Sequence, residues 1–144
     1  MSGAADYTVT TARWTDAESP LRSVRHAVFV VEQRVPESLE WDGADNTSLH
    51  ALAVDANGAP IGCARLLPDG HIGRVAVLAT WRRRGVGQAL VARLIDEARV
   101  RGQVRVIVNA QVDAMPFYAR YGFVASGDVF EEAGIPHRVM ERAL

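Results

Sequence analysis

The sequence predicts an α/β protein of the α+β type, with a mixed, mostly antiparallel central sheet and helices on both faces. Two turn signals, Asn57-Gly58 and Pro68-Asp69-Gly70, separate three consecutive β-rich segments, as expected for an antiparallel meander. The third segment is followed by a long amphipathic helix and then by another β-rich segment. A helical crossover of this kind connects parallel strands, so one parallel pair is expected behind the antiparallel front.

The other elements follow from hydrophobic periodicity and helix-ending residues. Leu21, Val24, Val28 and Val31 recur at helical spacing, and Pro36 ends that helix. Gly102 stands where a helix C-terminus is expected. In chain order, we expect a strand at 7–14, a break at 16–20, a helix at 21–33, an acidic loop at 37–47, strands at 48–55, 61–67 and 71–78, a helix at 85–102, a strand at 104–109, a short helix at 115–120, a strand from 122, a loop at 127–136 and a strand at 137–142.

The composition is that of one globular domain spanning residues 1–144, with 49% hydrophobic and 23% charged residues. A formal net charge of -1 gives no overall field that would attract nucleic acid or a membrane surface. No apolar run is long enough to cross a bilayer, and no export signal is evident. Cys63 is the only cysteine, which excludes an internal disulfide. We expect a cytoplasmic monomer or homodimer without a bound metal.

The most informative segment is the turn between strand 71–78 and helix 85–102, which reads Arg82-Arg83-Arg84-Gly85-Val86-Gly87-Gln88. The first N–H groups of a helix lack internal partners and lie at the positive end of its dipole. Glycines allow a phosphate to approach the main chain, and arginines attract it over longer distances. The turn therefore predicts a phosphate site, with an ordinary strand-to-helix turn as the alternative. Arg83 and Arg84 either contact that phosphate or only face water.

Two common phosphate motifs are excluded. A kinase-type P-loop needs a lysine, and the chain contains none. A dinucleotide fingerprint needs a third glycine, but Leu90 stands at that position. The following strand also ends near Asn109 without the expected acidic residue.

The pattern Arg82-x-x-Gly85-x-Gly87 follows a Val-x-Val strand and precedes Phe117-Tyr118-Ala119-Arg120-Tyr121-Gly122-Phe123. Together with the order of elements, these motifs resemble the GNAT superfamily of acyl-CoA-dependent N-acyltransferases along the whole chain. Segments 28–33, 109–111 and 130–137 further resemble its small ElaA-like branch. The resemblance implies an N-acetyltransferase that moves an acetyl group from acetyl-CoA to a primary amine of a small molecule by direct attack.

The resemblance also implies roles for individual residues. The main-chain groups of Val75 and Val77 would pair with the pantetheine arm between splayed parallel strands, and the Val77 N–H would polarise the thioester carbonyl. Tyr118 would protonate the leaving thiolate. Asn109 is either a pantetheine ligand or a turn-forming residue. The expected coenzyme A set is Val75, Ala76, Val77, Arg82, Arg83, Arg84, Gly85, Val86, Gly87, Gln88, Asn109 and Tyr118.

The proton acceptor for the amine is left open. An amine with a pKa near 10 is only about a thousandth neutral at pH 7, so a base has to take its proton. Family members often use a glutamate on the strand before the phosphate loop, but segment 71–74 contains no acid. Histidine has the ordinary pKa that suits this role best, whereas a purely structural His137 is the alternative. The candidates are Glu32, Glu40, Glu131, Glu132 and His137, acting directly or through water.

The acidic segment 32–45 favours a small cationic acceptor. The residues expected to line the acceptor site are Phe29, Glu32, Glu40, Trp41 and His50. Two other functions stay open. The missing strand glutamate is compatible with a catalytically weak acyl-CoA-binding sensor, and a related fold with a Phe-x-x-Glu segment occurs in acyl-homoserine-lactone synthases, which use a different acceptor.

Overall fold

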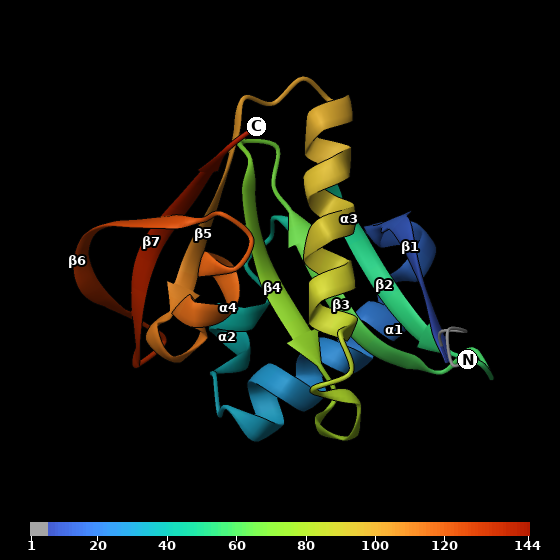
Figure 1. Cartoon of the computed structure of the whole chain (residues 1–144). Coiled ribbons are helices and arrows are strands. Elements are labelled where there is room, and N and C mark those ends of the chain that lie inside the picture. The colour runs from blue at the N-terminus through green and yellow to red at the C-terminus, as the bar shows by residue number, and fades with distance from the viewer. Residues whose placement is uncertain (1–5) are drawn as a thin grey trace.

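A seven-stranded mixed sheet forms the centre of the protein (Figure 1). The strands are β1 (Tyr7–Arg13), β2 (Leu49–Asp55), β3 (Pro60–Leu66), β4 (His71–Val77), β5 (Arg105–Gln111), β6 (Val124–Glu132) and β7 (Ile135–Ala143). Their spatial order in the computed structural model, which describes residues 6–144, is β1-β2-β3-β4-β5-β7-β6. Only the β4–β5 pair among these is parallel, which confirms the predicted fold class.

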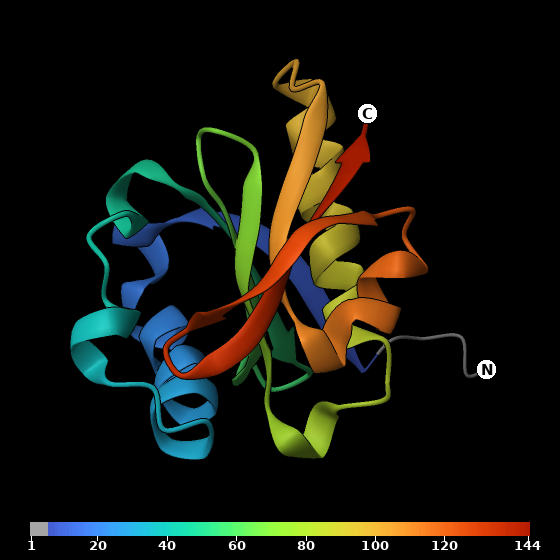
Figure 2. The same ribbon diagram turned by 90° about the vertical axis from the view of Figure 1, so that its left-hand side faces the viewer.

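Helices cover both faces of the sheet. One side carries α1 (Trp14–Arg25), a π-helical segment (His26–Glu32), α2 (Glu37–Glu40) and a 3₁₀ turn (Asp45–Thr47), and the other carries α3 (Val86–Val100) and α4 (Met115–Ala119). Further 3₁₀ turns, Ala79–Trp81 and Val112–Ala114, precede α3 and α4. Figure 2 shows α1 and α2 on one side of the sheet and α3 on the opposite side.

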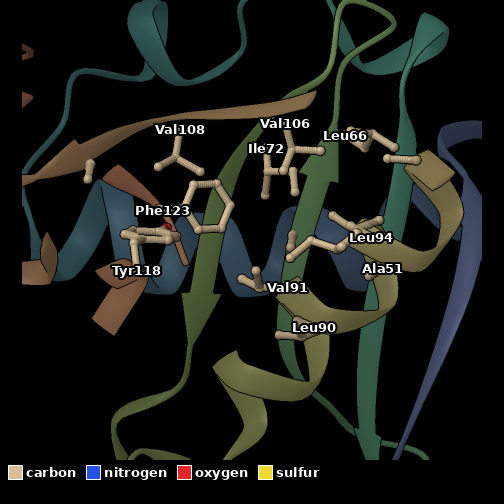
Figure 3. Packing of buried hydrophobic residues seen from close by; sticks show 14 of the residues in the cluster. Ala51, Leu66, Ile72, Leu90, Val91, Leu94, Val106, Val108, Tyr118 and Phe123 are labelled. Carbon is tan, nitrogen blue, oxygen red and sulfur yellow. The ribbon is translucent and has the colours of Figure 1, made fainter. Parts of the chain in front are cut away.

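Each helical layer buries its own hydrophobic cluster against the sheet. Leu90, Val91 and Leu94 of α3 belong to one cluster with Ile72 of β4 and Val108 of β5 (Figure 3). On the opposite face, the apolar side of α1 packs against β2 and β3 through Leu21, Val24, Leu52 and Cys63. Because strand side chains alternate between faces, these two clusters fix which β4 and β5 residues point to which side.

The parallel strands β4 and β5 are paired over only part of their length. Their pairing is limited to His71 with Ile107 and Ile72 with Val108, although β4 continues to Val77 and β5 to Gln111. Arg74 has a positive φ of 49°, and the β3–β4 register shifts beside it. This bulge turns the rest of β4 away from β5. A gap therefore opens between the two central strands.

The first helix begins earlier than the sequence pattern predicts. The expected break at 16–20 is wrong, because α1 starts at Trp14, directly after β1, and Pro20 lies within it. Ala17 has non-helical angles (φ −141°, ψ 25°), so a second helical piece begins after it. Pro20 then falls in the first turn of that piece, where no internal N–H donor is needed. The predicted helix 21–33 is also divided, since it becomes π-helical from His26.

The predicted loop at 127–136 is a hairpin instead. β6 continues to Glu132, and Ala133 and Gly134 turn the chain into β7 with φ angles of 54° and 75°. Two positive φ angles define a type I′ turn, which normally carries Asn-Gly or Gly-Gly. Because alanine occupies the first of these positions, the sequence pattern did not predict the turn. The acidic segment 37–47 likewise contains α2 and a 3₁₀ turn rather than only loop.

Candidate active site

A cleft of about 710 Å³ occupies the gap between β4 and β5. Its walls come from both faces of the sheet: the π-helical segment and α2 on one side, and the start of α3 together with α4 on the other. The turn of the β6–β7 hairpin adds a third wall. Parts of the chain that are distant in sequence therefore meet around the exposed edge of β4.

The main chain of β4 presents Val75 and Val77 to this gap. The Leu78 N–H donates to the Ile61 carbonyl of β3 at 2.9 Å, so Leu78 and Ala76 share the side that faces β3. By strand alternation, Val75 and Val77 direct their N–H and C=O groups to the opposite side. The Val77 carbonyl accepts a hydrogen bond of 2.9 Å from Arg82 Nε. An extended ligand entering the gap would meet a strand edge.

The N-terminus of α3 lies at one end of the cleft. Gly85 is its N-cap, with a φ of 81°, and supplies no side-chain cap. The first hydrogen bond of the helix runs from the Ala89 N–H to the Gly85 carbonyl at 3.0 Å. The N–H groups of Val86, Gly87 and Gln88 therefore have no acceptor within the helix. A Cβ on Gly87 would lie 3.7 Å from the Phe117 and Val77 side chains. Gly87 thus lies where this end of the cleft is narrow.

The three arginines of this turn have different roles. Arg82 makes a bidentate ion pair with Glu32, with distances of 2.6 Å and 2.5 Å. This hydrogen bonding lowers the pKa of Glu32 and raises that of Arg82. Arg83 and Arg84 are exposed, and the Arg84 guanidinium stacks 4.7 Å from the centre of the Trp81 ring. Because Glu32 is held as a paired carboxylate, it is a weak base.

Tyr118 is the buried phenol of the cleft. It belongs to α4, is 8% exposed, and packs between Phe117 and Phe123, as Figure 3 shows for Phe123. Burial raises the pKa of Tyr118 to about 12. The phenol therefore keeps its proton at neutral pH and can donate it to a stronger base formed in the cleft.

Polar side chains of β5 and β7 form the opposite wall. Val108 and Ala110 point into the α3 cluster, so Asn109 and Gln111 point to the α1 side. His137 is the cross-strand partner of Gln111 and also lines the cleft. Gln111 Nε2 donates to Gln33 Oε1 at 2.9 Å, which joins β5 to the end of the π-helical segment. The predicted strand end at Asn109 lies two residues too early, because β5 continues to Gln111.

Three acids of the predicted acidic loop are paired with arginines inside the protein. Arg25 donates to Glu40 at 2.7 Å and to Asp45 at 2.6 Å, and all three side chains are buried. Arg65 makes two bonds of 2.9 Å to Asp42. Burial alone would raise the pKa of Asp42, but the hydrogen bonds from Arg65 and Ala44 bring it well below its ordinary value. The charges of these three carboxylates are therefore offset by neighbouring arginines, and the cationic acceptor stays a prediction.

Several predicted residues lie elsewhere. His50 is 1% exposed, lies against Trp14, and bonds the Asp45 carbonyl at 3.0 Å, so it does not line the cleft. Trp41 faces a shallow surface hollow next to Arg22. Glu131 is also outside the cleft, because alternation along β6 places its neighbour Glu132 there instead.

The structure brings most of the predicted set together. The cleft-lining members of that set are Phe29, Glu32, Glu40, Val75, Ala76, Val77, Arg82, Gly87, Asn109, Tyr118, Glu132 and His137. Sequence reasoning missed Gln33 and Gln111, which close one wall. Gln111 could have been found from the alternation that already placed Asn109 on that face of β5.

Comparisons with known proteins agree with this geometry. Residues 9–144 match the family model described as "Acetyltransferase (GNAT) domain". The chain belongs to the GNAT acetyltransferase family. It is 40% identical over 121 residues to the uncharacterized N-acetyltransferase YjcF of Bacillus subtilis, covering 81% of this chain and 86% of that protein.

Two solved GNAT relatives share the fold closely. An acyl-CoA N-acyltransferase from Pseudomonas aeruginosa has a TM-score of 0.84 and 34% identity, covering 95% of this chain and 99% of its own. ElaA of Escherichia coli has a TM-score of 0.84 and 31% identity, covering 94% and 99%. The predicted resemblance to the superfamily and to its ElaA-like branch is therefore confirmed, and a coenzyme A thioester is the substrate class that this family implies.

Two further findings concern the part of the chain that the structure describes. Among residues 6–144, no three His, Cys, Asp or Glu side chains are grouped as metal ligands. Over the same residues, the helices are too short or too polar to cross a bilayer.

Proposed function

We propose that this GNAT protein is an N-acetyltransferase that moves the acetyl group of acetyl-CoA to a primary amine of a small molecule. One observation carries the proposal: the edge of β4 at Val75 and Val77, which is not paired with β5, lies between the α3 N-terminus and the buried Tyr118 phenol. An extended pantetheine arm can add to such an edge as a further strand would. The diphosphate then meets the N–H groups of Val86 to Gln88.

In this arrangement, the chain supplies a hydrogen-bond donor for the thioester carbonyl and a general acid for the sulfur. The Val77 N–H polarises the thioester carbonyl and stabilises the negative charge that develops on its oxygen during attack. Tyr118 donates its proton to the departing sulfur as the carbon–sulfur bond breaks. Arg82 already bonds the Val77 carbonyl and Glu32, so it stiffens the turn that carries the phosphate site. Arg83 and Arg84 stay exposed and supply attraction for the phosphates.

A small acceptor suits the size of the cleft. Its volume of about 710 Å³ has to hold both the pantetheine end and the acceptor. Such volumes are typical of small-molecule sites. The π-helical segment, α2 and the hairpin turn enclose the acceptor side, which favours a small amine over a protein side chain on a folded partner.

Ligand-induced stabilisation tests the cofactor assignment. Acetyl-CoA at about a hundred times its dissociation constant should stabilise the protein by about 2.7 kcal/mol, raising its melting temperature. ATP and NAD should have no such effect, because they lack the pantetheine arm that pairs with β4. Equal stabilisation by ATP would reject the assignment.

A panel of primary amines, assayed for thiol release from acetyl-CoA, tests the reaction itself. Turnover with at least one small amine is expected. Strong acetyl-CoA binding without turnover on any amine would instead support the sensor interpretation.

A further inference from the structure

The β6–β7 hairpin holds His137 in one orientation on the acceptor side of the cleft. His137 is 6% exposed, and its imidazole stacks on Phe130, with 5.9 Å between ring centres and 25° between ring planes. Ala133 and Ile135 of the same hairpin pack against the α1-side cluster. His137 therefore lies on the face opposite Tyr118, which belongs to the α3-side cluster.

The backbone fixes which ring nitrogen of His137 carries a proton. Nδ1 lies 2.7 Å from the Ile135 carbonyl oxygen. A carbonyl oxygen only accepts, so Nδ1 has to be the donor. In the neutral ring, the lone pair is then on Nε2. A histidine held in this tautomer is prepared to accept a proton at Nε2.

Glu132 lies beside that nitrogen. Its Oε2 is 3.6 Å from His137 Nε2, which is too long for a hydrogen bond but close enough for charge stabilisation. The Glu132 side chain is half-exposed, at 50%. Nε2 therefore keeps its lone pair free for an incoming proton, and the carboxylate stabilises the imidazolium that results.

The other charged groups of the cleft are already engaged. Glu32 pairs with Arg82, and Glu40 and Asp42 pair with Arg25, Arg65 and Arg74. His71 lies at the paired end of β4 and β5, 3.0 Å from Asp69. The neighbours of His137 on β5 and β7 that line the cleft, Gln111 and Ile135, are neutral, and Tyr118 of α4 is protonated. Glu132 is thus the charged group in direct reach of the imidazole.

We propose that His137 is the proton acceptor for the amine and that Glu132 is its positioning and charge-stabilising partner. The inference rests on the acetyl transfer proposed above. His137 Nε2 takes one proton from the ammonium group, and the freed nitrogen lone pair attacks the thioester carbon. The carbon–nitrogen bond forms and the carbon–sulfur bond breaks, while Tyr118 protonates the sulfur. The attacking nitrogen then gives its second proton to the Tyr118 phenolate, which restores the phenol. The net proton of the reaction is therefore the one on His137, which is released to water.

Kinetics of matched variants test this assignment. With the amine of the panel that the wild-type protein acetylates fastest, His137→Gln should lower kcat/KM by about a hundredfold or more. Glu132→Gln should lower it by about tenfold, through kcat rather than through the KM for the amine, because the carboxylate that positions and stabilises the imidazolium is lost. Asp128→Asn removes an exposed carboxylate of the same strand, outside the cleft, and should change neither value. All three variants should bind acetyl-CoA with wild-type affinity. A wild-type kcat in Glu132→Gln would overturn the proposal.

An NMR measurement tests the same inference without any substrate. Nitrogen-15 shifts of imidazole rings distinguish the two neutral tautomers, and the chain has only four histidines, so His137→Gln assigns the signal. The Nδ1–H tautomer is expected for His137. An Nε2–H tautomer would reject the proton-acceptor role even if acetyl transfer is observed. Turnover on none of the amines, with the Nδ1–H tautomer present, would reject the proposed function instead.

Discussion

At the scale of single residues, the environment decides which ionisable groups of the cleft can do chemistry. Glu32 and Glu40 have the right residue type for a base, but each is committed to an arginine. Tyr118 has lost solvent contact without gaining a charged partner, so burial raises its pKa to about 12. Ion pairing therefore removes Glu32 and Glu40 as candidate bases. Burial instead keeps Tyr118 in the protonated form that a general acid needs.

The Tyr118→Phe variant tests the acid. Turnover should fall by about a hundredfold or more, because the phenol proton is lost while the ring still fills its place. The dissociation constant for acetyl-CoA should change little. Because the pKa of Tyr118 is raised to about 12, the loss should be the same at every pH between about 6 and 9.

The matched control is Tyr121→Phe. Tyr121 also contacts the Phe117 ring, with 5.4 Å between ring centres, but does not line the cleft. Its loss of a hydroxyl group should leave turnover unchanged. Wild-type turnover in Tyr118→Phe would remove this residue from the mechanism.

At the scale of elements, local patterns predicted the strand, turn and helix around residues 75–90. The sequence pattern of each of these elements lies within a few consecutive residues, and α3 begins within a residue or two of the expected position. The β6–β7 hairpin was missed because its turn uses Ala133, whose positive φ of 54° is imposed by the pairing of the flanking strands. Long-range pairing cannot be read from a local pattern, and so the placement of Glu132 beside His137 also depended on the structure.

Two glycines that flank α3 allow a controlled test of the phosphate site. Gly85 precedes the helix with a φ of 81°, and Gly102 follows it with a φ of 79°. Valine at either position is strained by about 1–2 kcal/mol, so both variants should lose similar stability. Gly85→Val should also weaken acetyl-CoA binding by at least about tenfold, because the side chain and the strained turn disturb the phosphate-facing N–H groups. Gly102→Val should bind normally in the same calorimetric titration. Wild-type affinity in Gly85→Val would place the diphosphate elsewhere.

At the scale of the whole molecule, a buried ionic network joins the α1 layer to the sheet. Arg25 on α1 contacts Glu40 and Asp45, and Arg65 on β3 shares Asp45 at 3.1 Å. The partners are far apart in sequence, which is why the acidic segment could not be recognised as a structural feature before the fold was known. The network positions α2, and with it one wall of the cleft, against β4 through Arg74.

Removal of Arg25 should therefore destabilise the protein far more than removal of its neighbour Arg22. Arg25→Met keeps an apolar stem between Trp14 and Trp41 but leaves Glu40 and Asp45 buried without this partner. Breaking a buried pair from one side costs about 3–5 kcal/mol, to be measured by urea unfolding. Arg22 also stacks on both tryptophans, but its ion pair with Glu18 is about half-exposed. Arg22→Met should cost less than about 1 kcal/mol. Equal losses in the two variants would mean that stacking on the tryptophans, rather than the ionic network, holds the α1 layer to the sheet.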